Sequence, residues 1–547
     1  MKKIYVLATL FVATLSGCSS FLDADLKSDV PGADYYGTEA GFESLTNAAY
    51  SSLRTIYGGD PWLLEGGTDL FTTGRTSVDI SCLYGQSFTS ANSAVATFYT
   101  DHYKAISLAN EVIYWGKDDA GRAGRVAEAR GLRALWYLNL VQQFGGVPLI
   151  KERIVGLLSE ASRASELDVY GFVIDELKAI ASSSDLVATD NTGRFNKAAA
   201  NHYLAKAYLC RGYKSNSNTD FTEAVNAAKA AGAGNALTTP FATLFSNAGE
   251  GNSEVLLFAE YSLETVKDNT SGNKQQAHFG DYLNGSGDGH KYTSSTLAPS
   301  LWMHEVFNTN TNNPDADERY DATFMTELRT SYWHFYDSDK KDVSAVKFYY
   351  CPSWRLADVD AWRAEFPSRA SAQVVEMTPN GININGVSTT YEAKVRDDVF
   401  GVSCFRKFDD IGNGRSIFST TSSMRDVYLA RLGETNLIAA EASVKLNLPA
   451  EAVKYVNIVR DRAKAPQATQ AEMSIEYILN ERARELAGEN HRWTDLARTG
   501  KLAEYVEAYN WEISAGQVTS KFYLRPIPLS AIELNPALEG DQNQGWD

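Results

Sequence analysis

Apolar residues recur every three or four positions in several segments of the chain, the spacing that places them on one face of an α-helix. Such segments run from Ala127 to Phe144, from Lys197 to Gly212 and from Ile475 to Leu486. The Gly-Gly-Val-Pro stretch at 145–148 predicts the end of the first helix, and Gly488 predicts the C-cap of the last. The first and last thirds of the chain are therefore expected to be helical.

Each of these helices has another helical segment just before it in the sequence. The partner segments are 101–115, 169–180 and 450–463. Antiparallel pairs with small residues at the crossing are similar to tetratricopeptide-type units, although the chain shows no fixed repeat length. The pattern therefore predicts helix pairs at both ends of the chain.

The middle third has a different pattern. From residue 247 to about 424 the helical spacing gives way to Gly, Asn, Asp, Ser and Pro, with short apolar runs such as Val255–Ala259 that predict buried strands. Long loops on a helical scaffold often carry function. We therefore expect an irregular, loop-rich insertion with a few short strands.

The first eighteen residues predict export and anchoring. Lys2 and Lys3 precede an apolar run from Ile4 to Leu15, which is too short to span a bilayer and is typical of a signal peptide. The ending Leu15-Ser16-Gly17-Cys18 resembles the bacterial lipobox, in which the cysteine is lipidated and becomes the mature N-terminus. An ordinary signal peptide with a chance cysteine is the alternative. Residues 1–17 are thus expected to be removed, leaving Cys18 as a lipid anchor.

Charge and cysteine content exclude some classes of protein. The formal charge of the 547 residues is −17, and it becomes −19 once Lys2 and Lys3 leave with the signal peptide. So acidic a protein repels phosphate backbones, which argues against a nucleic-acid partner. Cys82, Cys210, Cys351 and Cys404 lack metal-ligand spacing and exclude a dense disulfide scaffold, although one bridge in an oxidising compartment stays open.

Aromatic residues make up 12% of the chain, enough to suggest ring-lined binding surfaces. Sugar rings stack on Trp and Tyr, while their hydroxyls bond to Asp, Asn and Arg. Two stretches combine these residue types, and the candidate ligand residues in them are Trp62, Asp69, Arg75, Tyr84, Tyr292, Trp333 and Trp354. For each single ring, packing in the core is the commoner alternative.

Motifs for catalysis and metal binding are weak. His304-Glu305 begins like a zincin helix, but Asn308 stands where a second histidine is required, so no metal site is predicted there. No complete nucleophile elbow occurs, although a glycosidase needs only two carboxylates, which sequence alone does not exclude. We predict no catalytic residue and no cofactor.

Charged residues within the helical segments are expected to form interhelical ion pairs rather than an active site, because unpaired buried charge is costly. Arg130 and Arg133 lie three apart on one helix, and Glu434 and Glu441 lie on another. The 317–320 segment, with Asp317, Arg319 and Tyr320, is likewise expected to be scaffold.

Several blocks of the sequence, in the same order, resemble the SusD/RagB family and together span almost the whole chain. Among them are Phe21-Leu22-Asp23, Ala127-Glu128-Ala129-Arg130-Gly131-Leu132-Arg133-Ala134, Phe144-Gly145-Gly146-Val147-Pro148-Leu149, Arg431-Leu432-Gly433-Glu434, Gly488-Glu489-Asn490-His491-Arg492-Trp493, Leu524-Arg525-Pro526-Ile527-Pro528 and Gln542-Asn543-Gln544-Gly545-Trp546. Each block alone is weak, and their common order makes the resemblance strong.

The resemblance implies a mainly α SusD-like fold, with four tetratricopeptide-like helix pairs and the irregular insertion. It divides the mature chain into an N-terminal region, 18–246, and a RagB/SusD region, 247–547, of which 247–424 is the insertion and 425–547 holds the C-terminal helix pairs and tail.

The resemblance also implies a lipoprotein of the outer membrane, facing the cell exterior, that binds an oligosaccharide and delivers it to a SusC-like TonB-dependent transporter. A peptide-binding RagB-like lipoprotein is the alternative, and a glycoside hydrolase is less favoured. The identity of the glycan, and whether a calcium ion is bound, stay open at this point.

Overall fold

The computed structural model describes residues 35–74, 77–155, 160–262, 264–266, 271–279, 296–309, 311–379, 381–390, 403–411 and 422–546. The chain divides into two compact units, residues 1–45 and residues 46–547. In the first unit the described residues open the helix α3 (Glu39–Tyr57), which continues into the second. All contacts described below lie within the second unit.

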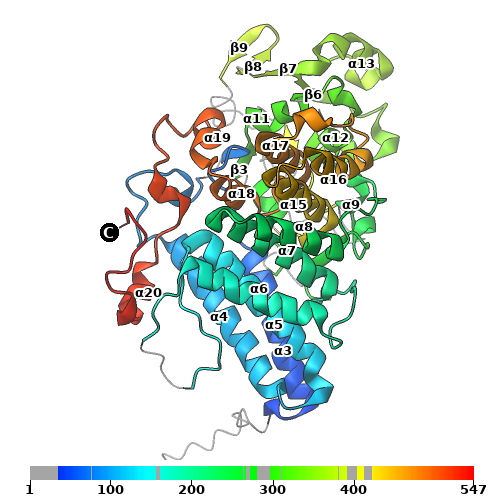
Figure 1. Cartoon of the computed structure of the whole chain (residues 1–547). Coiled ribbons are helices and arrows are strands. Elements are labelled where there is room, and N and C mark those ends of the chain that lie inside the picture. The colour runs from blue at the N-terminus through cyan, green and yellow to red at the C-terminus, as the bar shows by residue number, and fades with distance from the viewer. Residues whose placement is uncertain are drawn as a thin grey trace, which may run out of the picture. The chain divides into compact units, whose positions relative to one another are not determined.

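A stack of antiparallel helices forms the N-terminal half of the second unit (Figure 1). Its members are α4 (Ser93–Gly116), α5 (Ala123–Phe144), α6 (Glu166–Ser182), α7 (Lys197–Ser215) and α8 (Asn218–Ala231), and each packs against the next. Side chains of Asn92, Ser165, Asn196 and Ser217 cap four of them by accepting a backbone N–H. The predicted helices are confirmed, and α5 ends at Gly145 as expected.

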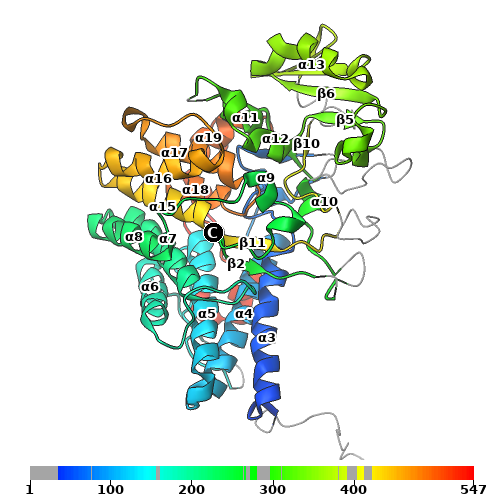
Figure 2. The ribbon, with the colours of Figure 1, turned by 90° about the vertical axis from the view of Figure 1, so that its right-hand side faces the viewer.

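Of the C-terminal helices, the first three continue this stack (Figure 2), whereas the last packs on α4. In order, the C-terminal helices are α15 (Leu432–Lys445), α16 (Pro449–Arg462), α17 (Ile475–Leu486), α18 (Arg492–Arg498), α19 (Leu502–Tyr509) and α20 (Leu529–Leu534). Because α15 packs against α7, α8, α16 and α17, it joins the two helical thirds across the insertion. The predicted helices at both ends of the chain are confirmed, but α16, which the sequence predicted to pair with α17, packs mainly on α15.

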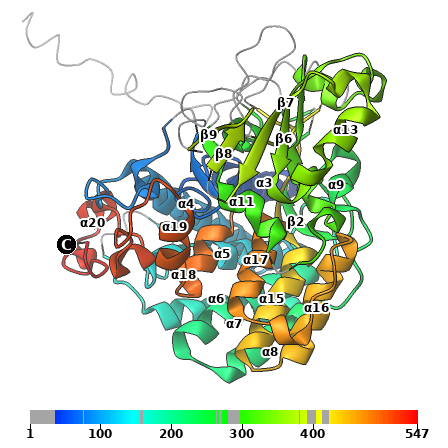
Figure 3. The ribbon, with the colours of Figure 1, turned by 90° about the horizontal axis from the view of Figure 1, so that it is seen from above.

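The insertion contains several small sheets, of which one has five strands in the order β5-β6-β7-β8-β9 (Figure 3). These strands are β5 (Glu327–Arg329), β6 (Val346–Pro352), β7 (Gln373–Thr378), β8 (Gly381–Ile384) and β9 (Val387–Thr389). Only β6 and β7 are parallel, and α13 (Val359–Glu365) lies in the connection between them.

The remaining strands form two-stranded antiparallel pairs. They are β1 (Phe71–Thr73) with β3 (Leu297–Pro299), β4 (Phe324–Met325) with β10 (Cys404–Phe405), and β2 (Val255–Ala259) with β11 (Val427–Arg431). The short helices α9 (Phe241–Leu244), α10 (Gln275–Phe279), α11 (Leu301–Glu305) and α12 (Arg319–Thr323) lie between them in the sequence. The strand predicted at Val255–Ala259 is confirmed and fully buried.

A hydrophobic core joins the insertion to the helices. Its buried rings include Phe71, Phe279, Phe324, Phe405 and Phe408, which pack beside Ala483 and Ala487 at the end of α17. Trp62, Trp302 and Trp354 pack at the edge of this core and are only partly buried. The core therefore presents aromatic side chains at its margin.

Candidate ligand-binding site

The charged residues predicted as scaffold do pair between helices. Arg130 and Arg133 of α5 both reach Glu176 of α6, at 2.8 and 2.7 Å, and Arg498 reaches Glu441 at 2.8 Å. These residues hold neighbouring helices together, so they are not an open catalytic cluster.

The most buried charges gather around α17. Arg319 is fully buried and pairs with Asp317, Glu481 and Glu485 at 2.7, 2.8 and 3.0 Å. Burial alone would raise the pKa of Glu485, but the guanidinium groups of Arg462, Arg431 and Arg319 hold it well below its usual range. Asp317 and Arg319 are therefore scaffold, as the sequence predicts.

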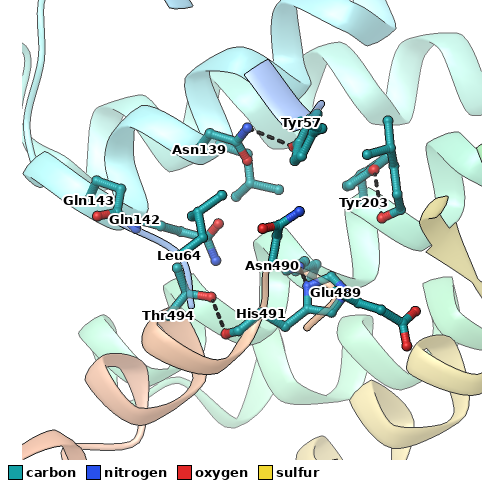
Figure 4. A pocket seen from close by; sticks show the side chains of 13 residues that line it. Tyr57, Leu64, Asn139, Gln142, Gln143, Tyr203, Glu489, Asn490, His491 and Thr494 are labelled. Carbon is teal, nitrogen blue, oxygen red and sulfur yellow. Dashed lines mark hydrogen bonds between the residues drawn. The ribbon is translucent and has the colours of Figure 1, made fainter. Parts of the chain in front are cut away.

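An enclosed polar cavity lies between α5, α7 and the 489–494 segment (Figure 4). Asn139 donates to the Tyr57 hydroxyl at 2.7 Å, and the Thr494 hydroxyl donates to the carbonyl of His491 at 2.8 Å. Burial lowers the pKa of His491 to about 3. The cavity measures about 20 Å³, which is room for about one water molecule. It is part of the scaffold interior and too small for a nutrient.

An open pocket of about 350 Å³ surrounds Trp62, which is half-buried at its wall. Polar side chains share the lining: Asp60, Asp79, Asp101 and Lys274. The pocket lies between the end of α3 and the start of α4. Its volume falls within the ~300–1,000 Å³ typical of ligand pockets. We refer to it as the Trp62 pocket.

Gly58, the residue before the lining residue Gly59, holds two segments together beside this pocket. The backbone amide of Gly58 donates to the carbonyl of Arg54 near the end of α3. The carbonyl of Gly58 accepts the backbone amide of Lys274 at 3.0 Å. A Cβ atom at Gly58 would lie 2.0 Å from the Tyr261 hydroxyl oxygen. Only a residue without a side chain lets these segments approach so closely.

Around Trp62 the polar groups are already oriented. Its ring meets the imidazole of His278 edge-on, with centroids 5.1 Å apart. Asp60 pairs with Lys274 at 2.9 Å and with His278 at 3.1 Å. The hydrogen bond from His278, with help from Lys274, outweighs burial and holds the pKa of Asp60 well below its usual range. An aromatic face beside an ionised carboxylate and an ammonium group can bind a polyhydroxylated ligand.

Other candidates from the sequence lie in the interior. The side chain of Asp69 is fully buried and binds Arg492 through both carboxylate oxygens, at 2.8 and 2.6 Å. Tyr84 is buried and donates to the carbonyl of Gly67 at 2.7 Å. Both stabilise the scaffold in this structure, and neither lines the Trp62 pocket. Arg75 and Tyr292 lie outside the described residues, as does Cys18.

Trp333 and Trp354 are half-buried but lie outside the lining of the Trp62 pocket. Trp333 packs beside Tyr332, with ring centroids 5.0 Å apart. The indole N–H of Trp354 donates to Asp315 at 3.0 Å, and its ring packs on Tyr320. Of the three half-buried tryptophans predicted as ligand residues, Trp62 is the one that lines this pocket.

Sequence reasoning missed Asp60, Asp101 and Lys274 as pocket residues. Asp60 is two positions from Trp62, and the mixture of Asp with Trp in that stretch was the available signal. Lys274 is more than 200 positions away in the sequence and reaches Asp60 only through the fold.

Cysteine and metal chemistry add no further site among the described residues. Cys82, Cys210 and Cys351 are buried free thiols. His304 is buried against Tyr320, and burial lowers its pKa to about 3. Within the described ranges no three His, Cys, Asp or Glu side chains are grouped to hold a metal ion, and no helix is long and apolar enough to cross a membrane.

The helix-pair scaffold thus carries an open pocket lined by Trp62 and polar side chains. Two family models match the chain: one described as the SusD family, over residues 253–546, and one described as starch-binding, associating with the outer membrane, over residues 20–209. The chain belongs to the SusD family.

Named relatives support this assignment. SusD-like protein P25 of Formosa agariphila is 25% identical, over 100% of this chain and 99% of its own length. Starch-binding protein SusD of Bacteroides thetaiotaomicron is 24% identical, over 79% of this chain and 74% of its own. Among solved structures, surface glycan-binding protein A of B. thetaiotaomicron in complex with laminarihexaose superposes with a TM-score of 0.64 and 19% identity, covering 92% of this chain and 99% of that one.

Proposed function

We propose that this protein binds an oligosaccharide at the cell surface, with the Trp62 pocket as its ligand site. The observation that carries the proposal is the half-buried Trp62 ring beside Asp60 and Lys274 in an open pocket. Two comparisons support it. One relative is named as a starch-binding protein, and a solved structure with a similar fold is a glycan-binding protein in complex with laminarihexaose. The sugar would stack on the indole while its hydroxyls bond to the charged groups. No catalytic role is proposed.

We further propose that lipidated Cys18 anchors the protein to the outer membrane, where it faces the exterior. It delivers its ligand to a SusC-like TonB-dependent transporter. The signal peptide and lipobox support the anchor, and the matching family model, described as associating with the outer membrane, supports the location. The family resemblance supports the transporter partner.

The test is calorimetric titration of the mature protein with a panel of neutral oligosaccharides, including maltohexaose and laminarihexaose. Trp62→Ala should weaken binding about thirtyfold or more, because truncating a central aromatic commonly costs ~2 kcal/mol. Thermal melts of each variant show whether the fold is kept.

Trp333→Ala and Trp354→Ala are matched controls, since both rings are half-buried and lie outside the pocket. Loss of binding in one of them, with Trp62→Ala unaffected, would place the sugar elsewhere. A parent protein that binds peptides and no saccharide of the panel would instead favour the RagB-like alternative.

A further inference from the structure

A second open pocket lies on the adjoining face of α3. Asn47, Ser51 and Arg54 line it, whereas Thr55 and Gly59 line the Trp62 pocket. Its other walls come from 191–194, 250–251, 258–261, Thr265 and Asp426. The volume is about 810 Å³, within the ~300–1,000 Å³ of ligand sites. We call it the Asp426 pocket.

Two arginines hold the walls of the Asp426 pocket in place. Arg194 pairs with Glu128 at 2.9 Å, donates to Asn47 at 3.1 Å and lies over the Tyr50 ring. This links the loop before α7 to α3. A wall fixed in this way needs little ordering when a ligand binds.

Arg54 fixes a second part of the lining. Its guanidinium pairs with Glu260 at 2.6 Å and lies 4.8 Å from the centroid of the Tyr261 ring. Because both arginines are already paired with carboxylates, neither offers an uncompensated positive charge to an anionic ligand.

Acceptor atoms in the pocket have spare hydrogen-bonding capacity. Glu250 accepts the amide of Asp426 through Oε1 at 3.2 Å, and Asp426 accepts the amide of Tyr261 through Oδ1 at 2.8 Å. Within the described ranges no donor is recorded for Glu250 Oε2 or Asp426 Oδ2. Burial, with the charges of Glu250 and Glu260, raises the pKa of Asp426 to about 7 despite Arg425. Hydroxyl groups of a ligand could donate hydrogen bonds to these two oxygens.

Neutral polar groups complete the rim. Asn191, Thr192 and Thr265 are exposed there, and Tyr50 and Tyr261 also line the pocket, each with an arginine over its ring. Amide and hydroxyl groups beside carboxylate acceptors match the hydroxyl-bearing edges of a sugar. The carboxylates would repel glycans bearing uronate or sulfate groups.

We infer that the Asp426 pocket binds a neutral saccharide and that the protein therefore has two saccharide sites on adjoining faces of α3. The inference rests on the proposed glycan-binding function and adds a second site to it. A long glycan chain that reaches both pockets would gain avidity from the pair.

Blocking each pocket separately tests the inference. Ser51→Trp fills the Asp426 pocket and Thr55→Trp fills the Trp62 pocket, each from an exposed position on α3. Thr222→Trp on α8 is the control, because Thr222 is also exposed and its hydroxyl also bonds to the helix backbone. The probes are the neutral hexasaccharides of the panel, titrated calorimetrically after a thermal melt of each variant.

The parent and Thr222→Trp should bind two saccharides per chain, and each blocking variant should bind one. If a single glycan spans both pockets, each blocking variant should instead lower the affinity for that glycan at least tenfold. Asp426→Asn, which replaces a carboxylate oxygen by an amide donor with little change in shape, should weaken the same site by about tenfold. It also gives an independent result should Ser51→Trp fail to fold.

The outcomes separate the two proposals. If Thr55→Trp abolishes all binding while Ser51→Trp and Asp426→Asn bind as the parent does, the second site is wrong and the proposed function stands. If the parent binds no saccharide of the panel, the proposed function fails as well.

Discussion

Single buried charges contribute to this fold through their partners. Arg319 is fully buried against Asp317, Glu481 and Glu485. Arg319→Met should leave the buried Asp317 without its cation and take one of several cations from Glu481 and Glu485, and so lower the free energy of unfolding by about 3–5 kcal/mol. Urea denaturation measures the loss.

Arg130→Met is the matched comparison. The Arg130 side chain is 33% exposed, and Glu176 keeps its bond to Arg133. This change should cost about 1 kcal/mol or less. Equal losses in the two variants would mean that burial of the arginine does not determine its contribution.

Glu65 should make the stability of the fold depend on pH. Burial raises its pKa from 4.5 to about 8, although the amide of His491 donates to it at 3.0 Å. Between these values the unfolded chain releases the proton and the folded chain keeps it, so this residue makes stability fall as pH rises.

Glu65→Gln keeps the carbonyl acceptor and removes the titration. The variant should therefore gain stability relative to the parent as pH rises from 5 to 8, by about 1.4 kcal/mol for each unit of pKa difference. Denaturation curves across this range measure the gain. A difference between parent and variant that does not change with pH would contradict the expectation.

At the level of elements, helix ends show how tertiary contacts add to a local rule. Gly488 follows α17 with φ +78°, and a Cβ atom there would lie 2.5 Å from the Phe408 ring. Gly500 follows α18 with φ +72° and has nothing within 4 Å of that position. Both glycines satisfy the same backbone requirement, but only Gly488 is also packed.

Gly500→Ala should cost about 1–2 kcal/mol from the backbone alone. Gly488→Ala should cost about 1–3 kcal/mol more, since the core must move to admit the methyl group. Denaturation midpoints, compared at equal slopes, test the difference. Indistinguishable losses would show that the ring of Phe408 moves aside at no cost.

For the whole molecule, we predict that the lipid anchor at Cys18 does not contribute to the stability of the fold. Cys18→Ala should leave the melting temperature unchanged and release the protein from the membrane fraction, because the lipid chains supply the anchoring free energy. The fractionation must be done without the transporter, which could itself retain the protein. Continued membrane association would then argue against the lipoprotein prediction.

A second prediction for the whole molecule concerns the proposed transporter partner. A stable complex with a SusC-like barrel should bury more than the ~1,600 Å² of a standard interface. Affinity purification from solubilised outer membranes should recover a barrel protein. Repeated purification without one would count against the delivery step.

What the sequence determined is the set of local elements. The apolar spacing predicted α5, α7 and α17, and the structure extends the first by four residues and the second by three. These patterns succeed because a helix records its buried face every three or four residues. The same pattern predicted that Arg133 and Glu434 would be paired inside the stack, since unpaired charge there is costly.

Only the tertiary structure decided which residues meet. It paired Arg319 with Glu485 and brought Lys274 to Asp60 beside Trp62, contacts between residues far apart in the chain. It also buried Asp69 and Tyr84 while leaving Trp62 at a pocket wall. The physical reason is that an aromatic ring or a carboxylate has the same local pattern in a core as at a binding surface. Its role depends on which distant segments cover it.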